Sequence, residues 1–242
     1  MENTIGPTLG NGKICYVEIP AMDISASSAF YEKVFGWAIR KRGNGSIAFD
    51  DGIGEVSGTW VLGRKPSTEQ GLVVSIMVDN VEEAITLLEA SGSEIVFKMD
   101  LGGDQFIAWF TDPAGNILGI YQHPGGGHGK ICYLEIPAGD IEKSAGFYEA
   151  VFGWPLRNKG TEHVAFDDGV GVVSGMWAAD RKPSPEPGLL IYIMMDSVAD
   201  AVEKVKENGG KTVQPIGKDA PESTARFSDP FGNVLGLYQN PV

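Results

Sequence analysis

The chain is poor in the residues that form disulfides and hold metals. Its 242 residues include only 2 cysteines and 3 histidines. Cys15 and Cys132 occupy the same place in two similar apolar segments. Free cysteine commonly behaves as a small buried hydrophobe, and intracellular proteins rarely keep disulfides. We therefore expect two buried thiols rather than a disulfide or a reactive pair.

Positive charge and long apolar runs are also scarce. The sequence has 19 Lys and Arg against 32 Asp and Glu, a net charge of −13. Nucleic acids and anionic membrane surfaces require clustered basic residues, so neither is an expected partner. The pairs Arg64-Lys65 and Arg181-Lys182 are too short to change this and are interpreted as solvated loop charges, with binding of an anionic ligand group as the alternative. No run reaches the ~20 apolar residues of a membrane span. Met1–Asn11 also lacks the basic start and apolar run of a signal peptide, so the prediction is a cytoplasmic protein.

An internal repeat dominates the sequence. Residues 12–122 repeat without a gap as residues 129–239, and 55 of the 111 aligned pairs are identical. A fixed period of this kind indicates two copies of one unit that bury their faces against each other. The chain is thus predicted to be a pseudo-dimer, and a further homo-oligomer stays open. The predicted parts are an N-terminal extension at 1–11, repeat 1 at 12–122, a Gly-rich linker at 123–128 and repeat 2 at 129–242.

Each copy reads as two half-units with the same pattern. Gly12–Pro20 alternates like a strand, Asp23 is a candidate helix N-cap, and Gly36 ends the helix. Three short strands follow. The pattern then begins again with a strand at Leu72–Val78 and a second N-cap candidate at Asn80. One helix for every four strands predicts an α+β fold of four βαβββ half-units rather than a doubly wound parallel sheet.

Four motifs in order resemble the vicinal oxygen chelate superfamily, which contains glyoxalase I, bleomycin-resistance proteins and extradiol dioxygenases. The resemblance implies curved mixed sheets that enclose cup-shaped pockets for a small organic molecule. Many relatives are dimers of one such repeat, and this chain resembles that dimer fused. In repeat 1 the motifs are Glu18-Ile-Pro-x-x-Asp23-Ile, Phe30-Tyr31-Glu-x-Val-Phe-Gly36-Trp37, Val78-Asp-Asn-Val81-Glu-Glu-Ala84 and Asp112-Pro-x-Gly-Asn116. Repeat 2 matches from Glu135-Ile-Pro through Phe147-Tyr-Glu-x-Val-Phe-Gly-Trp154 to Asp229-Pro-x-Gly-Asn233.

The same resemblance implies a divalent metal in the cup, held by His, Glu or Gln. The matching positions here hold Tyr16, Val73 and Gly119 in repeat 1, and Tyr133, Leu190 and Gly236 in repeat 2, with a fourth position near Gly58 and Gly175. Except for tyrosine, rarely, these residue types do not ligate such ions. Of the histidines, His123 and His128 fall in the linker and His163 stands alone at the start of a strand. We therefore expect no metal and no cofactor.

Strand alternation assigns the residues that face the cup, because residues two apart share a side of a sheet. If Tyr16 faces the cup, so does Glu18, while Cys15, Val17 and Ile19 pack under the helices. The resulting wall is aromatic with a few polar groups, which suits a flat or amphipathic ligand. Trp37 and Trp154 are assigned to the core, whereas Trp60 and Trp177 are either core or cup wall. The ligand-binding candidates are Tyr16, Ser75, Trp109, Tyr121, Tyr133, Glu135, Tyr192, Arg226 and Tyr238.

Two classes of function remain open. One is a metal-free binding protein that sequesters a drug, toxin or metabolite, as in the bleomycin-resistance branch. The other is an enzyme of the lyase, isomerase or dioxygenase type, with a metal at non-standard ligands or with Glu and Tyr acid–base chemistry. Glu18 and Glu135 are its weak catalytic candidates. In a purely structural role, each Glu instead hydrogen-bonds a Tyr or a backbone group across the repeat interface.

A comparison of the two copies favours binding. They keep their turns and caps but differ at cup positions, with Ser75 opposite Tyr192 and Trp109 opposite Arg226. A shared catalytic set is expected twice intact, whereas unlike walls indicate one specialised pocket. The predicted working pocket contains Tyr133, Tyr192, Tyr238 and Arg226, and takes an aromatic or amphipathic molecule with an anionic group. The sequence leaves open whether one cup is built from a single repeat or from both. Arg226 needs a carboxylate partner, either from the ligand or from Glu135.

Overall fold

A computed structural model of the chain describes residues 6–67, 71–123, 127–183, 188–217 and 223–239. The backbone divides into two compact units. The described residues of unit 1 are 6–9, 17–67, 74–123 and 127–132. Those of unit 2 are 10–16, 71–73, 133–183, 188–217 and 223–239. No helix in these ranges is long and apolar enough to cross a membrane.

Each repeat contains the predicted half-unit of one strand, one helix and three strands twice in succession. The first repeat contains β1 (Ile14–Ala21), α1 (Ile24–Phe35), β2 (Ala38–Lys41), β3 (Ile47–Asp50), β4 (Ser57–Leu62), β5 (Val73–Val78), α2 (Val81–Ala90), β6 (Ile95–Gly102), β7 (Gln105–Thr111) and β8 (Ile117–Gln122). The second contains β9 (Ile131–Pro137), α3 (Ile141–Phe152), β10 (Leu156–Arg157), β11 (Ala165–Asp167), β12 (Ser174–Ala178), β13 (Leu190–Met194), α4 (Val198–Glu207), β14 (Lys211–Gln214), β15 (Ser223–Ser228) and β16 (Val234–Gln239). The predicted α+β class is confirmed.

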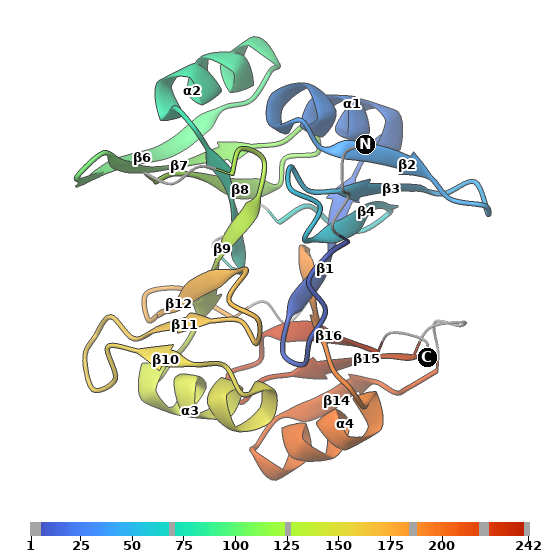
Figure 1. Ribbon diagram of the computed structural model, residues 1–242, viewed down its shortest axis with the longest axis vertical. Helices are drawn as coiled ribbons and strands as arrows, with labels where there is room; N and C mark the ends of the chain where they lie inside the picture. The colour runs from blue at the N-terminus through green and yellow to red at the C-terminus, as the bar shows by residue number, and fades with distance from the viewer. Residues whose placement is uncertain (1–5, 68–70, 124–126, 184–187, 218–222, 240–242) are drawn as a thin grey trace. The chain divides into compact units, whose positions relative to one another are not determined.

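The strands form two mixed sheets. Hydrogen bonds order them as β14-β15-β16-β13-β1-β4-β3-β2 and as β10-β11-β12-β9-β5-β8-β7-β6. The pairs β5–β8, β9–β12 and β13–β16 are parallel, whereas the hairpins are antiparallel. In unit 1, α1 and α2 lie side by side against the strands, and α3 and α4 do the same in unit 2 (Figure 1).

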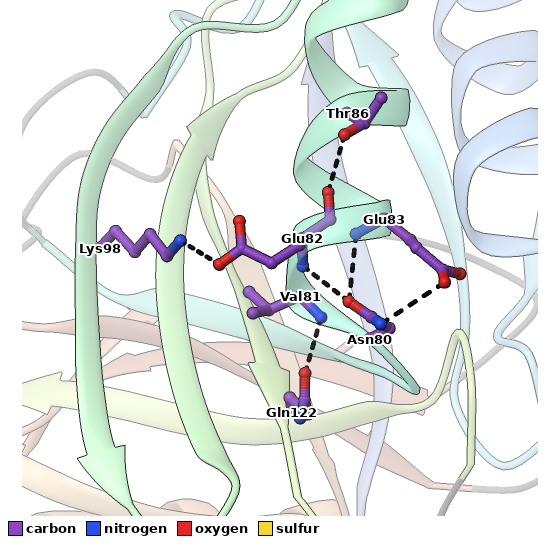
Figure 2. Close-up of polar contacts among 7 residues, drawn as sticks. All are labelled: Asn80, Val81, Glu82, Glu83, Thr86, Lys98 and Gln122. Atoms are coloured by element: carbon purple, nitrogen blue, oxygen red, sulfur yellow. Dashed lines mark hydrogen bonds and ion pairs between the residues drawn. The ribbon is translucent and has the colours of Figure 1, made fainter.

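The predicted N-caps hold the helices in place. The Asp23 side chain accepts a hydrogen bond from the N–H of Ala26 at 3.0 Å. The Asn80 side chain accepts from the N–H groups of Glu82 and Glu83 at 2.9 and 3.2 Å (Figure 2). Such contacts satisfy backbone donors that a helix start leaves unpaired. The N–H of Val81 donates to the Gln122 side chain at 2.7 Å, which ties α2 to the end of β8.

Stacked aromatic rings form the core of each unit. In unit 1, the ring of Trp37 lies 4.5 Å from that of Tyr31 and 4.3 Å from that of Phe49. Trp60 and its counterpart Trp177 are also buried, at 3% and 1% exposure, so both belong to the core rather than to a cup wall. Tyr31, Trp37, Phe49 and Trp60 are each kept in repeat 2, as expected for residues that fill the core of both units.

Each unit also holds the segment that opens the other repeat. In unit 1, the carbonyl of Gly129 accepts hydrogen bonds from the Trp37 indole at 2.7 Å and from the N–H of Gly52 at 2.9 Å. The carboxylate of Asp51 accepts from the N–H of Ile131 at 2.9 Å. The same set recurs in unit 2 around the carbonyl of Gly12 and the carboxylate of Asp168. The repeated sequence Gly-Lys-Ile-Cys, at 12–15 and 129–132, thus belongs in each case to the unit that is built mainly from the other repeat.

Candidate functional site

Three strands of unit 2 place a guanidinium beside a tyrosine. Arg226 on β15 is opposite Gly236 on β16, which is opposite Tyr192 on β13. Residues opposite one another across a sheet share a face. A β-carbon on Gly236 would lie 2.2 Å from the Tyr192 ring, so this ring lies directly over the glycine. Its hydroxyl accepts from Nε and Nη2 of Arg226 at 3.4 and 3.2 Å. The glycine therefore lets a tyrosine reach across one strand to orient an arginine.

Two further tyrosines belong to this face. The ring of Tyr16 meets that of Tyr192 edge-on, with centroids 6.0 Å apart. Tyr16 and Tyr238 are partly buried and pack against one cluster of buried side chains, and Tyr238 is opposite Met194 in the ladder. The result is an aromatic surface with one guanidinium, which we call the tyrosine–arginine face. The buried side chains of this face form one cluster, which contains Cys15, Leu190, Tyr192, Met194 and Val234.

The position of Cys15 corrects one prediction. Cys15 belongs to the buried cluster of the tyrosine–arginine face, and its thiol lies 3.6 Å from the carbonyl of Tyr192. It therefore does not pack on the helix side of the sheet, where the strand alternation placed it. The two-residue period fails at the start of β1, which follows the left-handed turn at Gly12 (φ 80°). Both cysteines are free and buried, as predicted. Burial raises the pKa of Cys132 to about 12, which keeps its thiol protonated and unreactive.

The predicted pocket membership also needs correction. Tyr133 and Glu135 lie on β9, opposite Ser174 and Met176 of β12, in the sheet that lacks β13 and β16. The strand beside β13 is β1, so Tyr16 rather than Tyr133 contacts Tyr192. Glu135 therefore does not serve as the carboxylate partner of Arg226.

The corresponding strands of unit 1 carry different chemistry. Trp109 is opposite Gly119, which is opposite Ser75. The Trp109 ring lies 4.7 Å from that of Phe97, and the Tyr121 hydroxyl donates to the Gln105 side chain at 2.7 Å. Burial and the nearby Cys132 thiol raise the pKa of Tyr121, so its hydroxyl is a neutral donor. This row contains an indole and a hydroxyl where unit 2 has a guanidinium and a phenol.

Each conserved glutamate forms an ion pair with an arginine 46 residues further along. Arg64 pairs with Glu18, and Arg181 pairs with Glu135. The prediction that these arginines are solvated loop charges was wrong, because each lies in a partly or largely buried ion pair. The second pair is the more enclosed, with side chains 5% and 8% exposed against 14% and 15% in the first. The signal in the sequence was the recurrence of both Glu and Arg at the same offset.

The Glu135 carboxylate is unusual in its surroundings. Burial raises its pKa, although the charge and hydrogen bond of Arg181 oppose this shift. Its Oε2 accepts from Arg181, whereas its buried Oε1 has no hydrogen-bond partner within the described part of the chain. A buried carboxylate oxygen without a donor is costly and is a feature of sites that act on protons or ligands.

The family model of the Glyoxalase/Bleomycin resistance protein/Dioxygenase superfamily matches residues 13–120 and again residues 130–237. The chain belongs to this superfamily. It is 30% identical over 130 residues to a "Glyoxylase-like domain-containing protein" of Didymella fabae, which covers 47% of this chain and 96% of that relative. It is 21% identical to the Mycobacterium bovis protein named "Putative glyoxylase CFP32", over 92% of both chains. Glyoxalase I from Zea mays shares the fold, with a TM-score of 0.73 and 19% identity over 94% of this chain and 92% of that one.

The residues of this superfamily member do not fit the divalent ion that the resemblance implies. A side chain at Gly119 or Gly236 would collide with Ser75 or Tyr192, because a β-carbon there lies 2.2 Å from those side chains. At Gly58 and Gly175 a β-carbon would lie 2.3 and 2.2 Å from backbone carbonyl oxygens. Across the ranges that the structure describes, no three His, Cys, Asp or Glu residues converge in a way that holds a metal. The glycines are thus required by the packing around them.

Proposed function

We propose that the chain is a metal-free small-molecule binding protein. Its ligand is a flat aromatic or amphipathic molecule with an anionic group, bound on the tyrosine–arginine face of unit 2. The observation that carries the proposal is the row Arg226–Gly236–Tyr192, with Tyr16 edge-on to the same ring. Tyrosine rings offer stacking area at low conformational cost, and an arginine fork matches a carboxylate in two hydrogen bonds.

The arginine is oriented by a neutral group. The hydroxyl of Tyr192 accepts from two nitrogens of Arg226, which orients the plane of the guanidinium. An anionic ligand whose ring contacts Tyr16 or Tyr238 can therefore direct its charged end toward Arg226. The residues at the expected metal positions support a site without an ion. At Gly236, the space that a metal-ligating side chain would need is filled by the ring of Tyr192.

The two units supply their own comparison for the binding test. We would screen aromatic carboxylates and their neutral amides by thermal shift, in the presence of EDTA. Carboxylates are expected to stabilise the wild type more than the amides do. Arg226→Ala should remove this preference, because a hydrogen bond to a charged group is worth about 1.5–3 kcal/mol, roughly a ten- to hundredfold loss in affinity. Arg226→Lys should keep part of it, and Trp109→Ala in unit 1 should change nothing.

Two results would overturn this proposal. Hits that survive both Arg226→Ala and Tyr192→Ser but disappear with Trp109→Ala would place the ligand on unit 1. Binding that EDTA abolishes and that Fe, Mn, Ni or Zn restores would show that a metal is required.

The buried Glu135 carboxylate supports a second candidate, acid–base catalysis without a metal. Its raised pKa, and an Oε1 that has no hydrogen-bond partner among the described residues, are what a general base needs. Hits from the screen would be incubated in deuterated water and followed by proton NMR. If Glu135 acts as a base, a carbon-bound proton of a ligand exchanges with wild type and with Glu18→Gln, but not with Glu135→Gln. Absence of exchange with wild type would leave binding as the function.

A further inference from the structure

Strand β6 differs from the other strands that end a sheet. The four terminal strands are β14, β2, β10 and β6, with 4, 4, 2 and 8 residues. Three large apolar side chains of β6 are exposed, namely Val96 at 43%, Met99 at 47% and Leu101 at 51%. A long, apolar edge strand is a template for pairing with another chain, and monomeric proteins protect such edges.

In the second repeat, the corresponding edge strand, β14, is shortened by a proline. Strand β14 ends at Gln214, and Pro215 follows at the position that Lys98 occupies in β6. Proline has no backbone N–H and is a common device for ending an edge. Repeat 1 has no proline between 95 and 102. Strand β6 therefore presents a longer open edge than its counterpart β14, with three exposed large apolar side chains against one.

We propose that β6 pairs antiparallel with β6 of a second copy of this chain. The segment Phe97–Asp100 is regular against β7 and lies between two irregularities of register. A twofold axis through Met99, perpendicular to the sheet, places Lys98 of each copy opposite Asp100 of the other. It also places Phe97 opposite Leu101. Moving the axis by one residue would oppose Lys98 with Lys98 or Asp100 with Asp100, and like charges directly opposite are destabilising.

The contact that Lys98 makes within its own chain does not compete strongly. Its ammonium pairs with Glu82 at the start of α2 (Figure 2), and the two side chains are 40% and 66% exposed. Exposed pairs of this kind contribute little to stability. The symmetric contact is confined to one strand, so the dimer is small in area and reversible.

Sedimentation velocity of the full chain across a range of concentrations tests this dimer. The wild type is expected to dimerise. Lys98→Asp and Asp100→Lys should each raise the dimer dissociation constant at least about tenfold, because two attractive pairs become repulsive. The double variant Lys98→Asp/Asp100→Lys should restore dimerisation. Glu82→Gln is the matched control, since it removes only the intrachain partner of Lys98 and should leave the constant unchanged.

Three outcomes overturn the proposal. The first is a wild type that sediments as a monomer at every concentration. The second is a dimer that Lys98→Asp leaves intact, which would place the interface elsewhere. The third is a double variant, shown by circular dichroism to be folded, that stays monomeric, because the two charges then do not face each other.

Discussion

Trp154→Ala is expected to lower the free energy of unfolding by about 3–5 kcal/mol, the range for removing a large buried aromatic side chain. Trp154 is fully buried, with its ring 4.9 Å from that of Tyr148 and 4.4 Å from that of Phe166. Its indole N–H donates to the carbonyl of Gly12 at 2.7 Å. The alanine therefore removes both a ring stack and one of the contacts that fix the segment leading to Tyr16.

The two contributions can be separated by a conservative change. Trp154→Phe keeps an aromatic ring between Tyr148 and Phe166 but removes the indole donor, which leaves the Gly12 carbonyl with the N–H of Gly169 as its one donor among the described residues. This variant should lose less, on the order of 1 kcal/mol for the hydrogen bond plus a small packing term. Urea unfolding measures both variants. A Trp154→Ala protein that is as stable as Trp154→Phe would contradict the assignment of the ring stack to the core.

Because Gly12 precedes the strand that carries Tyr16, the same variants report on the ligand face. We expect Trp154→Ala to weaken ligand binding as well as stability. The N-terminal segment is also fixed by the N–H of Ile14, which donates to Asp168, and by the N–H of Gly12, which donates to Met194. Binding should therefore fall without being abolished.

Local signals in the sequence were sufficient for much of the fold. The N-caps Asp23 and Asn80, and the Asp112-to-Asn116 turn, depend on contacts between neighbours in the chain. Asp23 and the Asp-Pro-x-Gly-Asn pattern of the Asp112-to-Asn116 turn recur in repeat 2, whereas Asn80 is replaced by Ser197, which caps α4 in the same way. The superfamily resemblance rested on these same positions.

The site was harder to predict because it depends on which strands become neighbours. Strand alternation placed Tyr133 and Tyr192 on inward faces, but it contains no information on whether β9 or β1 lies next to β13. The pairing of β13 depends on residues far apart in the sequence. Because β13 pairs with β1, the tyrosine that contacts Tyr192 is Tyr16 and not the predicted Tyr133. The Glu–Arg pairs were missed for a similar reason, because Arg181 follows β12 at the end of a parallel pairing with β9 that the sequence does not reveal.

Arg181→Ala is expected to have a destabilising effect of similar size, about 3–5 kcal/mol at neutral pH. Arg181 and Glu135 are 5% and 8% exposed, so the variant leaves a carboxylate enclosed without its ion-pair partner. Removing one member of a buried pair costs far more than the pair contributes, since the remaining charge has lost its hydration. In the wild type, burial already raises the pKa of Glu135 and Arg181 opposes the shift, so the variant's pKa should rise further.

The sign of the pH dependence follows from that direction. A carboxyl group whose pKa is raised on folding favours the folded state when it is protonated. This contribution is fully present below the pKa of the unfolded chain and is lost as pH rises through the folded pKa. The deficit of Arg181→Ala relative to wild type should therefore be small in mildly acidic buffer and reach its full value above neutral pH. Urea unfolding of both proteins over this range measures it.

The first repeat supplies the matched control for this variant. Arg64→Ala breaks the equivalent pair, but Arg64 and Glu18 are 14% and 15% exposed, so water can reach the remaining carboxylate and the loss should be smaller. Arg181→Ala/Glu135→Gln should recover much of the stability and most of the pH dependence, because no buried charge remains. Equal losses for Arg64→Ala and Arg181→Ala, or a deficit that does not change with pH, would show that Arg181 acts through packing rather than through its charge on Glu135.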